Sequence, residues 1–292
     1  MKKAKLAFVC SDCGSEYTKW QGQCFDCSAW NTLKQIHLGK AQSDRRSGGF
    51  SGLLEPVQTL NAVSTEVKPR LPAPSEEFNR VLGGGLVPGS AVLISGSPGA
   101  GKSTLLIQIL CELARTIPSL YVTGEESLSQ VALRAHRLRL KTDQIKVMSE
   151  TSVETILAAW DQEQPKLIVI DSIQVMQSET VDSAPGSVSQ VRESAAALIQ
   201  KAKQSDTILM LVGHVTKEGN LAGPRVLEHM IDAFLMLEGD ADGRYRTLRS
   251  IKNRFGAVNE LGVFAMTDRG MREVKNPSAI FLDRRGLQTP GS

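Results

Sequence analysis

A short glycine-rich stretch carries the clearest chemistry in this sequence. Residues 96–103 are Gly-Ser-Pro-Gly-Ala-Gly-Lys-Ser, which fits the P-loop pattern GxxxxGK[ST]. Its glycines let backbone N–H groups turn inward around phosphates, and the helix that follows adds partial positive charge. Lys102 reaches the β- and γ-phosphates, and Ser103 supplies a hydroxyl ligand for Mg²⁺. We expect ATP to be bound by Gly96, Ser97, Pro98, Gly99, Ala100, Gly101, Lys102, Ser103 and Thr104.

Acidic residues follow two later apolar runs. Asp171 ends "LIVID" and has the form of a Walker B carboxylate, which suits it to hold Mg²⁺ together with the P-loop serine. Glu125 and Glu126 end "LYVTGEES", where a carboxylate can orient or deprotonate the attacking water. Helix capping is the alternative there, because Ser127 and Gln130 form a capping-box pattern. Capping does not explain two adjacent acids.

A histidine follows the apolar run in "LMLVGHVTKEG". A polar side chain at this position can sense the γ-phosphate of ATP, and His214 is the candidate. A lone histidine is more often a structural residue whose hydrogen bonds are satisfied within the fold. The assignment of His214 as a γ-phosphate sensor therefore depends on the residues around it.

These motifs need a scaffold that brings strand ends together. Uninterrupted apolar runs that alternate with helix-like stretches indicate an α/β fold whose central sheet is mostly parallel and buried on both faces. Ligand chemistry then gathers at the carboxyl ends of the strands. The predicted strands are residues 91–94, 120–122, 167–170, 208–212 and 234–237.

Four of the five cysteines fall in residues 10–27, with the spacing C-x2-C-x10-C-x2-C. Two CxxC turns aim four thiolates at one point and predict a tetrahedral zinc site. A pair of disulfides is the alternative, and a reducing cytosol argues against it. Because four thiolates leave no open position, we expect a structural site whose metal supplies the folding energy. The ligands are Cys10, Cys13, Cys24 and Cys27.

Two tryptophans, Trp20 and Trp30, flank these cysteines. We favour their packing in the small core over stacking on a nucleic-acid base. The sequence then divides into a zinc-binding module (1–33), a linker rich in Gly, Ser, Pro and charge (34–75), and an ATPase domain (76–292).

The net charge of +3 hides an asymmetry. Lys and Arg outnumber Asp and Glu by eight to four in residues 1–50 and by ten to six in residues 240–292, whereas the middle is acidic. Both basic ends can face a polyanion, with a solvated surface as an equal alternative. The sequence has no apolar run long enough to span a membrane and no apolar signal core, so we expect a cytoplasmic protein.

The stretch "SIKNRFGAV" (250–258) holds two cations, Lys252 and Arg254. Residues 244–252 are predicted to form a strand, with "GVFAM" (262–266) as its hairpin partner. A period of two places both cations on one face if the strand persists, and Gly256 then permits the turn. Two cations held apart from their own P-loop suit a task on another subunit's phosphates. Chance surface charge is the alternative.

The order and content of these motifs resemble those of the bacterial RadA (Sms) DNA-repair proteins. The matching segments are the four-cysteine module, "EFNRVLGGGLVPGS", the P-loop, "GEES", "GHVTKEG", "AGPRVLEHMID" and "KNRFG". The resemblance covers essentially the whole chain, and the cysteine module joined to "GHVTKEG" and "KNRFG" is far more specific than the P-loop. It implies a RecA-like ATPase core that assembles as a ring hexamer on single-stranded and branched DNA. The expected activity is DNA-stimulated ATP hydrolysis that promotes branch migration in recombinational repair together with RecA.

The resemblance also assigns residues. Glu125 matches the catalytic glutamate of RecA-like sheets, ahead of Glu126. "KNRFG" resembles the K-x-R-x-G of ring helicases, in which the cations at positions 252 and 254 reach the nucleotide of the neighbouring subunit. Residues 172–192 and 216–226 are expected to be loops that line the central channel, with solvated loops as the alternative. The DNA-contact candidates are Lys217, Arg225 and Arg192.

One departure from the family is visible. RadA proteins usually continue into a Lon-protease-like domain, and this sequence stops about where that domain begins, so we expect either a truncated or a naturally short version. Two other hypotheses remain. One is a regulatory ATP-binding switch of the clock-protein type, against which the cysteine module and "KNRFG" argue. The other is a non-enzymatic zinc-dependent DNA adaptor, against which the complete set of ATPase motifs argues.

Overall fold

The computed structural model describes residues 5–10, 16–17, 19–25, 28–38, 57–62, 69–214, 225–240 and 243–275. The chain divides into two compact units, Met1–Gly49 and Phe50–Ser292. Each unit has a sheet of its own.

The first unit contains a three-stranded antiparallel sheet in the order β2-β1-β3. Its core is small: Cys24 and Leu33 are buried, and Phe8 and Tyr17 pack against them. The strands are β1 (Lys5–Cys10), β2 (Glu16–Tyr17) and β3 (Leu33–Leu38).

The two tryptophans of this unit do not fill that core. Trp20 is 58% exposed and Trp30 is 69% exposed, and Phe25 is exposed as well. The prediction that the tryptophans pack inside was therefore wrong. A unit this small has room for only a few side chains, and the strand residues already occupy it.

The second unit is built on a nine-stranded sheet in the order β12-β11-β10-β9-β4-β8-β7-β5-β6. The six strands from β9 to β6 are parallel, and β10, β11 and β12 extend the sheet in antiparallel fashion. The parallel strands are β4 (Ala91–Ser95), β5 (Ser119–Thr123), β6 (Lys146–Ser149), β7 (Leu167–Asp171), β8 (Ile208–Val212) and β9 (Ala233–Gly239). The antiparallel ones are β10 (Tyr245–Asn253), β11 (Leu261–Thr267) and β12 (Gly270–Glu273).

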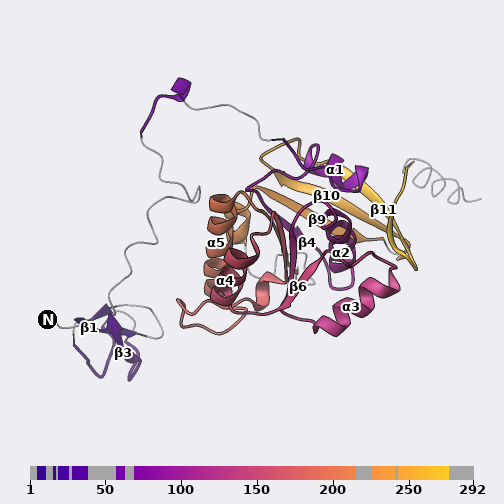
Figure 1. Ribbon diagram of the computed structural model, residues 1–292. Helices are drawn as coiled ribbons and strands as arrows, with labels where there is room; N and C mark the ends of the chain where they lie inside the picture. Colours follow the sequence, from indigo (N-terminus) through magenta and orange to yellow (C-terminus); the bar gives the residue numbers. More distant parts are fainter. Residues whose placement is uncertain are drawn as a thin grey trace, which may run out of the picture. The chain divides into compact units, whose positions relative to one another are not determined.

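Helices cover both faces of this sheet (Figure 1). One layer contains α1 (Glu76–Leu82), α2 (Lys102–Leu113) and α3 (Leu128–Arg137). The other contains α4 (Val153–Glu163), α5 (Val188–Ser205) and α6 (Arg225–Met230). The described residues also include two short 3-10 helices, η2 (Leu60–Ala62) and η3 (Ile173–Val175).

Strand β4 shows why its sequence is an uninterrupted apolar run. Val92 and Ile94 belong to the core on the α2 side, whereas Ala91 and Leu93 belong to the core on the α5 side. A strand covered on both faces has no polar positions left. Polar residues are therefore confined to the strand ends, which is where the candidate site lies.

The α/β class and the mostly parallel sheet are confirmed, and each predicted apolar run forms a strand. The hairpin of β10 and β11 is confirmed too. Strand β6 was not predicted, because this edge strand lacks an apolar run. The expected loop at 172–192 is shorter than predicted, since α5 begins at Val188. In the part of the chain that the structure describes, no helix is long and apolar enough to cross a membrane.

Trp160 of α4 anchors the second layer. Its side chain is 1% exposed, and its indole Nε1 donates to Thr207 Oγ1 at 3.2 Å. We predict that Trp160→Ala lowers the free energy of unfolding by about 3–5 kcal/mol, because it removes a large buried side chain and leaves a cavity. Leu133→Ala, at a position 69% exposed, should change it by less than about 0.5 kcal/mol. Urea denaturation of both variants measures this, and equal losses would contradict the assignment.

Candidate active site

The loop between β4 and α2 has the backbone that its motif requires. Gly101 precedes α2 with φ 98°, and a Cβ at Gly96 would lie 2.1 Å from the carbonyl oxygen of Leu237. Both positions therefore need glycine. Lys102 Nζ donates to the carbonyl oxygens of Gly96 and Ser97 at 2.9 and 3.1 Å. The lysine thus lies over the loop, where phosphates would be bound.

Lys102 is buried, with 4% of its surface exposed. Burial lowers the pKa of Lys102, and the carboxylates of Asp171 and Glu125 oppose this effect. A buried ammonium is costly unless opposite charge compensates it, and the compensation weakens with distance. The structure therefore brings together the P-loop lysine and the two acids that the sequence singled out from separate strands.

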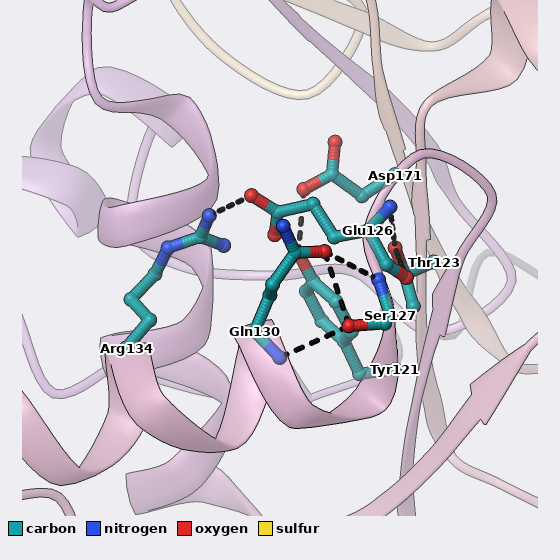
Figure 2. Close-up of polar contacts among 7 residues, drawn as sticks. All are labelled: Tyr121, Thr123, Glu126, Ser127, Gln130, Arg134 and Asp171. Carbon is teal, nitrogen blue, oxygen red and sulfur yellow. Dashed lines mark hydrogen bonds and ion pairs between the residues drawn. The ribbon is translucent and has the colours of Figure 1, made fainter.

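Asp171 ends β7 and is held by a neighbour that the sequence did not reveal. Tyr121 of β5 donates its hydroxyl to Asp171 Oδ2 (Figure 2). Burial, followed by the charge of Asp171, raises the pKa of Tyr121, so the phenol keeps its proton and remains a donor. Strands β5 and β7 are adjacent, with Thr123 opposite Asp171. The sequence could not predict the contact between Tyr121 and Asp171, because they lie far apart in the chain and only the pairing of β5 with β7 brings them together.

Glu125 lies just after β5 and accepts two hydrogen bonds. One comes from the hydroxyl of Ser172, and the other from His214 Nε2 at 3.3 Å. The hydrogen bond from His214 is the main cause that lowers the pKa of Glu125; burial opposes it and the bond from Ser172 adds to it. Glu125 is therefore ionised at neutral pH. His214, proposed as the γ-phosphate sensor, contacts the proposed catalytic acid directly.

Glu126 has a different environment from Glu125. Its carboxylate forms an ion pair with Arg134 of α3, and its backbone N–H donates to Thr123 Oγ1 at 3.0 Å (Figure 2). Ser127 and Gln130 form the expected capping box at the start of α3. This second acid is tied to the helix, whereas Glu125 faces the buried lysine and the histidine.

Arg254 does not lie near its own P-loop. Its backbone N–H donates to the carbonyl oxygen of Asp232, and the N–H of Asp232 donates to the carbonyl oxygen of Ala91. Ala91 begins β4, whereas the P-loop follows Ser95 at its end. Four residues of extended strand span about 13 Å. Arg254 and Lys102 therefore belong to opposite ends of β4.

Lys252 is held by the end of α6. Its Nζ donates to the carbonyl oxygens of Glu228 and Ile231, the latter at 2.9 Å. Burial and then the positive charge of Arg254 lower the pKa of Lys252, opposed by Asp232 and Glu228. A register shift in β10 between Ser250 and Lys252 interrupts the simple period of two. Both cations nevertheless contact the same segment, residues 228–232.

The predicted glycine of this motif serves close packing. Gly256 lies against Gly83, such that a Cβ at Gly256 would be 3.0 Å from Gly83 Cα. Arg70 joins the two segments by donating to the carbonyl oxygens of Gly83 and Phe255. Helix α1 and the "KNRFG" segment are thereby fastened together.

The DNA-contact candidates are only partly described. Lys217 lies outside the described residues, and Arg225 is the first residue of α6. Arg192 lies near the start of α5 and is exposed. Arg192 is thus available to solvent on a helix rather than on the expected loop.

Two of the four predicted zinc ligands, Cys10 and Cys24, lie among the described residues. Cys10 ends β1, and Cys24 is buried beside Tyr17, whose hydroxyl lies 3.3 Å from Cys24 Sγ. The N–H of Ser28 donates to the carbonyl oxygen of Cys24 at 2.8 Å. Cys13 and Cys27 lie outside the described residues.

Two family models match the chain. One described as AAA domain covers residues 56–220, more than half of the chain, and one described as rubredoxin metal binding domain covers residues 8–35. The first spans the P-loop, Glu125, Asp171 and His214, and the second spans the four cysteines.

Curated relatives match along the whole chain. The DNA repair protein RadA of Pseudomonas aeruginosa is 60% identical over 292 residues, that of Escherichia coli 59% over 297, and that of Bacillus subtilis 47% over 296. Each alignment includes 100% of this chain and 64% of the relative, so the chain spans less than two thirds of their length. The predicted resemblance to RadA proteins and the P-loop fold with an N-terminal zinc-ribbon module are confirmed. The chain belongs to the AAA domain family.

Proposed function

We propose that this protein is a DNA-dependent ATPase of recombinational DNA repair. The observation that carries the proposal is the convergence of Lys102, Glu125 and Asp171 at one edge of the sheet, in a chain similar throughout to RadA proteins. The remainder of the proposal follows the family resemblance that the sequence motifs indicate. The protein forms a ring, a hexamer in our proposal, acts with RecA, and moves branch points along single-stranded or branched DNA in the cytoplasm.

The chain's own residues account for ATP binding. Lys102 exchanges the two loop carbonyls that it now contacts for the β- and γ-phosphates. Backbone N–H groups of the loop and of the first turn of α2 surround the phosphates. Mg²⁺, when held by Ser103 and Asp171, supplies further charge neutralisation.

Glu125 is the proposed catalytic acid–base residue. Its lowered pKa keeps it ionised at neutral pH, so the carboxylate can orient the attacking water and accept its proton. His214 Nε2 contacts one carboxylate oxygen of Glu125. A γ-phosphate that binds near His214 can therefore change the position of Glu125. Glu126 is less suited to this role because Arg134 already neutralises it.

Lys252 and Arg254 are proposed to act on the nucleotide of a neighbouring subunit. The position of Arg254 at the far end of β4 supports action between subunits, since its own P-loop follows the other end of that strand. Cations placed near the transferred phosphoryl group stabilise the charge of the transition state. Hydrolysis then requires an assembly.

A structural zinc ion in the first unit completes the proposal. Cys10, Cys13, Cys24 and Cys27 would hold it, in agreement with the rubredoxin-type match over residues 8–35. Its chemistry is structural, because four thiolates fill the coordination sphere. Lys217, Arg225 and Arg192 remain our proposed contacts to DNA phosphates.

The proposed activity is tested by ATP turnover with and without single-stranded DNA. We expect DNA to stimulate turnover, and Lys102→Ala to reduce it about 100-fold or more because phosphate charge is no longer neutralised. Lys141→Ala, at an exposed surface position, is the matched control and should retain full activity. Absence of hydrolysis in the unaltered protein would refute the motor, and hydrolysis without DNA stimulation would favour the regulatory switch.

The two adjacent acids give a second prediction. Glu125→Gln should lower turnover about 100-fold while ATP binding is retained, because the amide cannot act as a base. Glu126→Gln should reduce turnover far less, since its carboxylate serves an ion pair with Arg134. Turnover and binding of a fluorescent ATP analogue are measured for both. A larger loss of turnover in Glu126→Gln would reverse the assignment.

Action between subunits is tested by mixing two inactive variants. Arg254→Ala subunits keep an intact P-loop, and Lys102→Ala subunits keep an intact arginine. Mixed assemblies therefore contain some complete interfaces, and we expect part of the ATPase activity to return. If mixed assembly is demonstrated by native mass spectrometry and no activity returns, Arg254 does not act on a neighbouring subunit.

A further inference from the structure

A buried carboxylate, that of Asp232, contacts the proposed interface arginine, Arg254. Asp232 is 4% exposed and lies between α6 and β9. Its Oδ1 accepts from Arg254 Nη1 at 3.0 Å, and Lys203 Nζ lies 3.5 Å from the same oxygen. Its Oδ2 accepts from the N–H of Ala91 at 3.0 Å. The sequence did not single out Asp232.

The contacts of Asp232 indicate a role beyond accepting a hydrogen bond from the backbone N–H of Ala91. A neutral acceptor would satisfy the N–H of Ala91 equally well, whereas a buried negative charge is costly and needs a cation. Of the two cations that form an ion pair with Asp232, Arg254 is the nearer, and its own side chain is 51% exposed. Asp232 therefore fixes one arm of the guanidinium and leaves the rest of it facing solvent.

We infer that Asp232 is a positioning residue: it orients the guanidinium of Arg254 so that this group can bind the phosphates held by the neighbouring subunit. Arginine presents five N–H donors in a rigid fork, so one arm can be held by a carboxylate while the other arm binds a phosphate. A side chain fixed beforehand loses less conformational freedom when it binds. This inference rests on the proposed action of Arg254 between subunits.

The backbone supports the same assignment. Asp232 itself cannot shift easily, because its N–H and its Oδ2 are both bonded to Ala91 of the buried strand β4. Its carbonyl oxygen accepts from the N–H of Arg254 at 3.0 Å. Arg254 is thus tied at both its backbone and its guanidinium to one rigid point in the sheet.

The test is the variant Asp232→Asn, because its amide oxygen can still accept from Ala91 but carries no charge for Arg254. We expect kcat to fall about tenfold, the size of effect caused by loss of one charge-assisted hydrogen bond, with KM for ATP changed less than about twofold. Lys203→Met removes the other cation of Asp232 and should leave kcat within about twofold of the unaltered protein. An unchanged or raised kcat in Asp232→Asn would overturn the inference.

Subunit mixing separates positioning from a structural defect. In a mixture of Asp232→Asn with Lys102→Ala, every intact P-loop belongs to an Asp232→Asn subunit. Recovered activity would show that those P-loops are sound and that a neighbour's arginine restores them. If this mixture fails while Arg254→Ala with Lys102→Ala recovers, Asp232 acts on its own P-loop and the inference is wrong. If the mixture of Arg254→Ala with Lys102→Ala also recovers no activity, although mixed assembly is demonstrated, Arg254 does not act between subunits. The inference about Asp232 is then wrong as well.

A second variant covers the case in which Asp232→Asn does not fold, as judged by circular dichroism and thermal unfolding. Arg254→Lys keeps the positive charge but cannot hold a carboxylate and a phosphate on two arms of a fork. We expect its kcat to fall nearly as far as that of Arg254→Ala. Full activity in Arg254→Lys would overturn the inference, because a single ammonium would then suffice.

Discussion

Burial of the parallel strands on both faces is the constraint on which the rest of this molecule depends. Because β4, β7 and β8 are fully covered by helices, they cannot carry polar groups along their length. Charged residues are therefore placed where the strands end. Parallel pairing brings those ends to one edge, so Lys102, Glu125 and Asp171 meet although they lie in separate parts of the chain.

The site is then a balance of burial against charge. Burial lowers the pKa of Lys102, and the charges of Asp171 and Glu125 oppose this effect. Each carboxylate is in turn held by a donor from another strand or loop, Tyr121 for Asp171 and His214 for Glu125. Both acids are thereby held in a fixed orientation, and groups oriented beforehand stabilise a transition state at low cost.

The opposite end of the same strand carries the other half of the proposed machinery. Asp232 is hydrogen-bonded to Ala91, the first residue of β4, and holds Arg254, the proposed interface cation. The loop after the last residue of the same strand is the proposed phosphate site. In our proposal, one rigid strand thus fixes the distance between a subunit's own nucleotide site and the cation that contacts the neighbouring subunit. Coupling between subunits in our proposal rests on that rigidity.

The sequence by itself determined the motifs and the fold class. GxxxxGK[ST] requires one backbone conformation, apolar runs of this length require a buried sheet, and paired CxxC turns require a metal or a disulfide. It also identified Lys102, Asp171 and the capping box of α3, because each depends on local spacing.

Only the tertiary structure decided the partners. Tyr121 lies against Asp171 because β5 pairs with β7, and Asp232 lies against Arg254 because β9 is adjacent to both β4 and β10. Such pairings join distant segments and leave no local pattern. The exposure of Trp20 and Trp30 was likewise decided by the fold, since the small first unit had already filled its core with other side chains. Local spacing specifies which groups are present, and strand order specifies which of them meet.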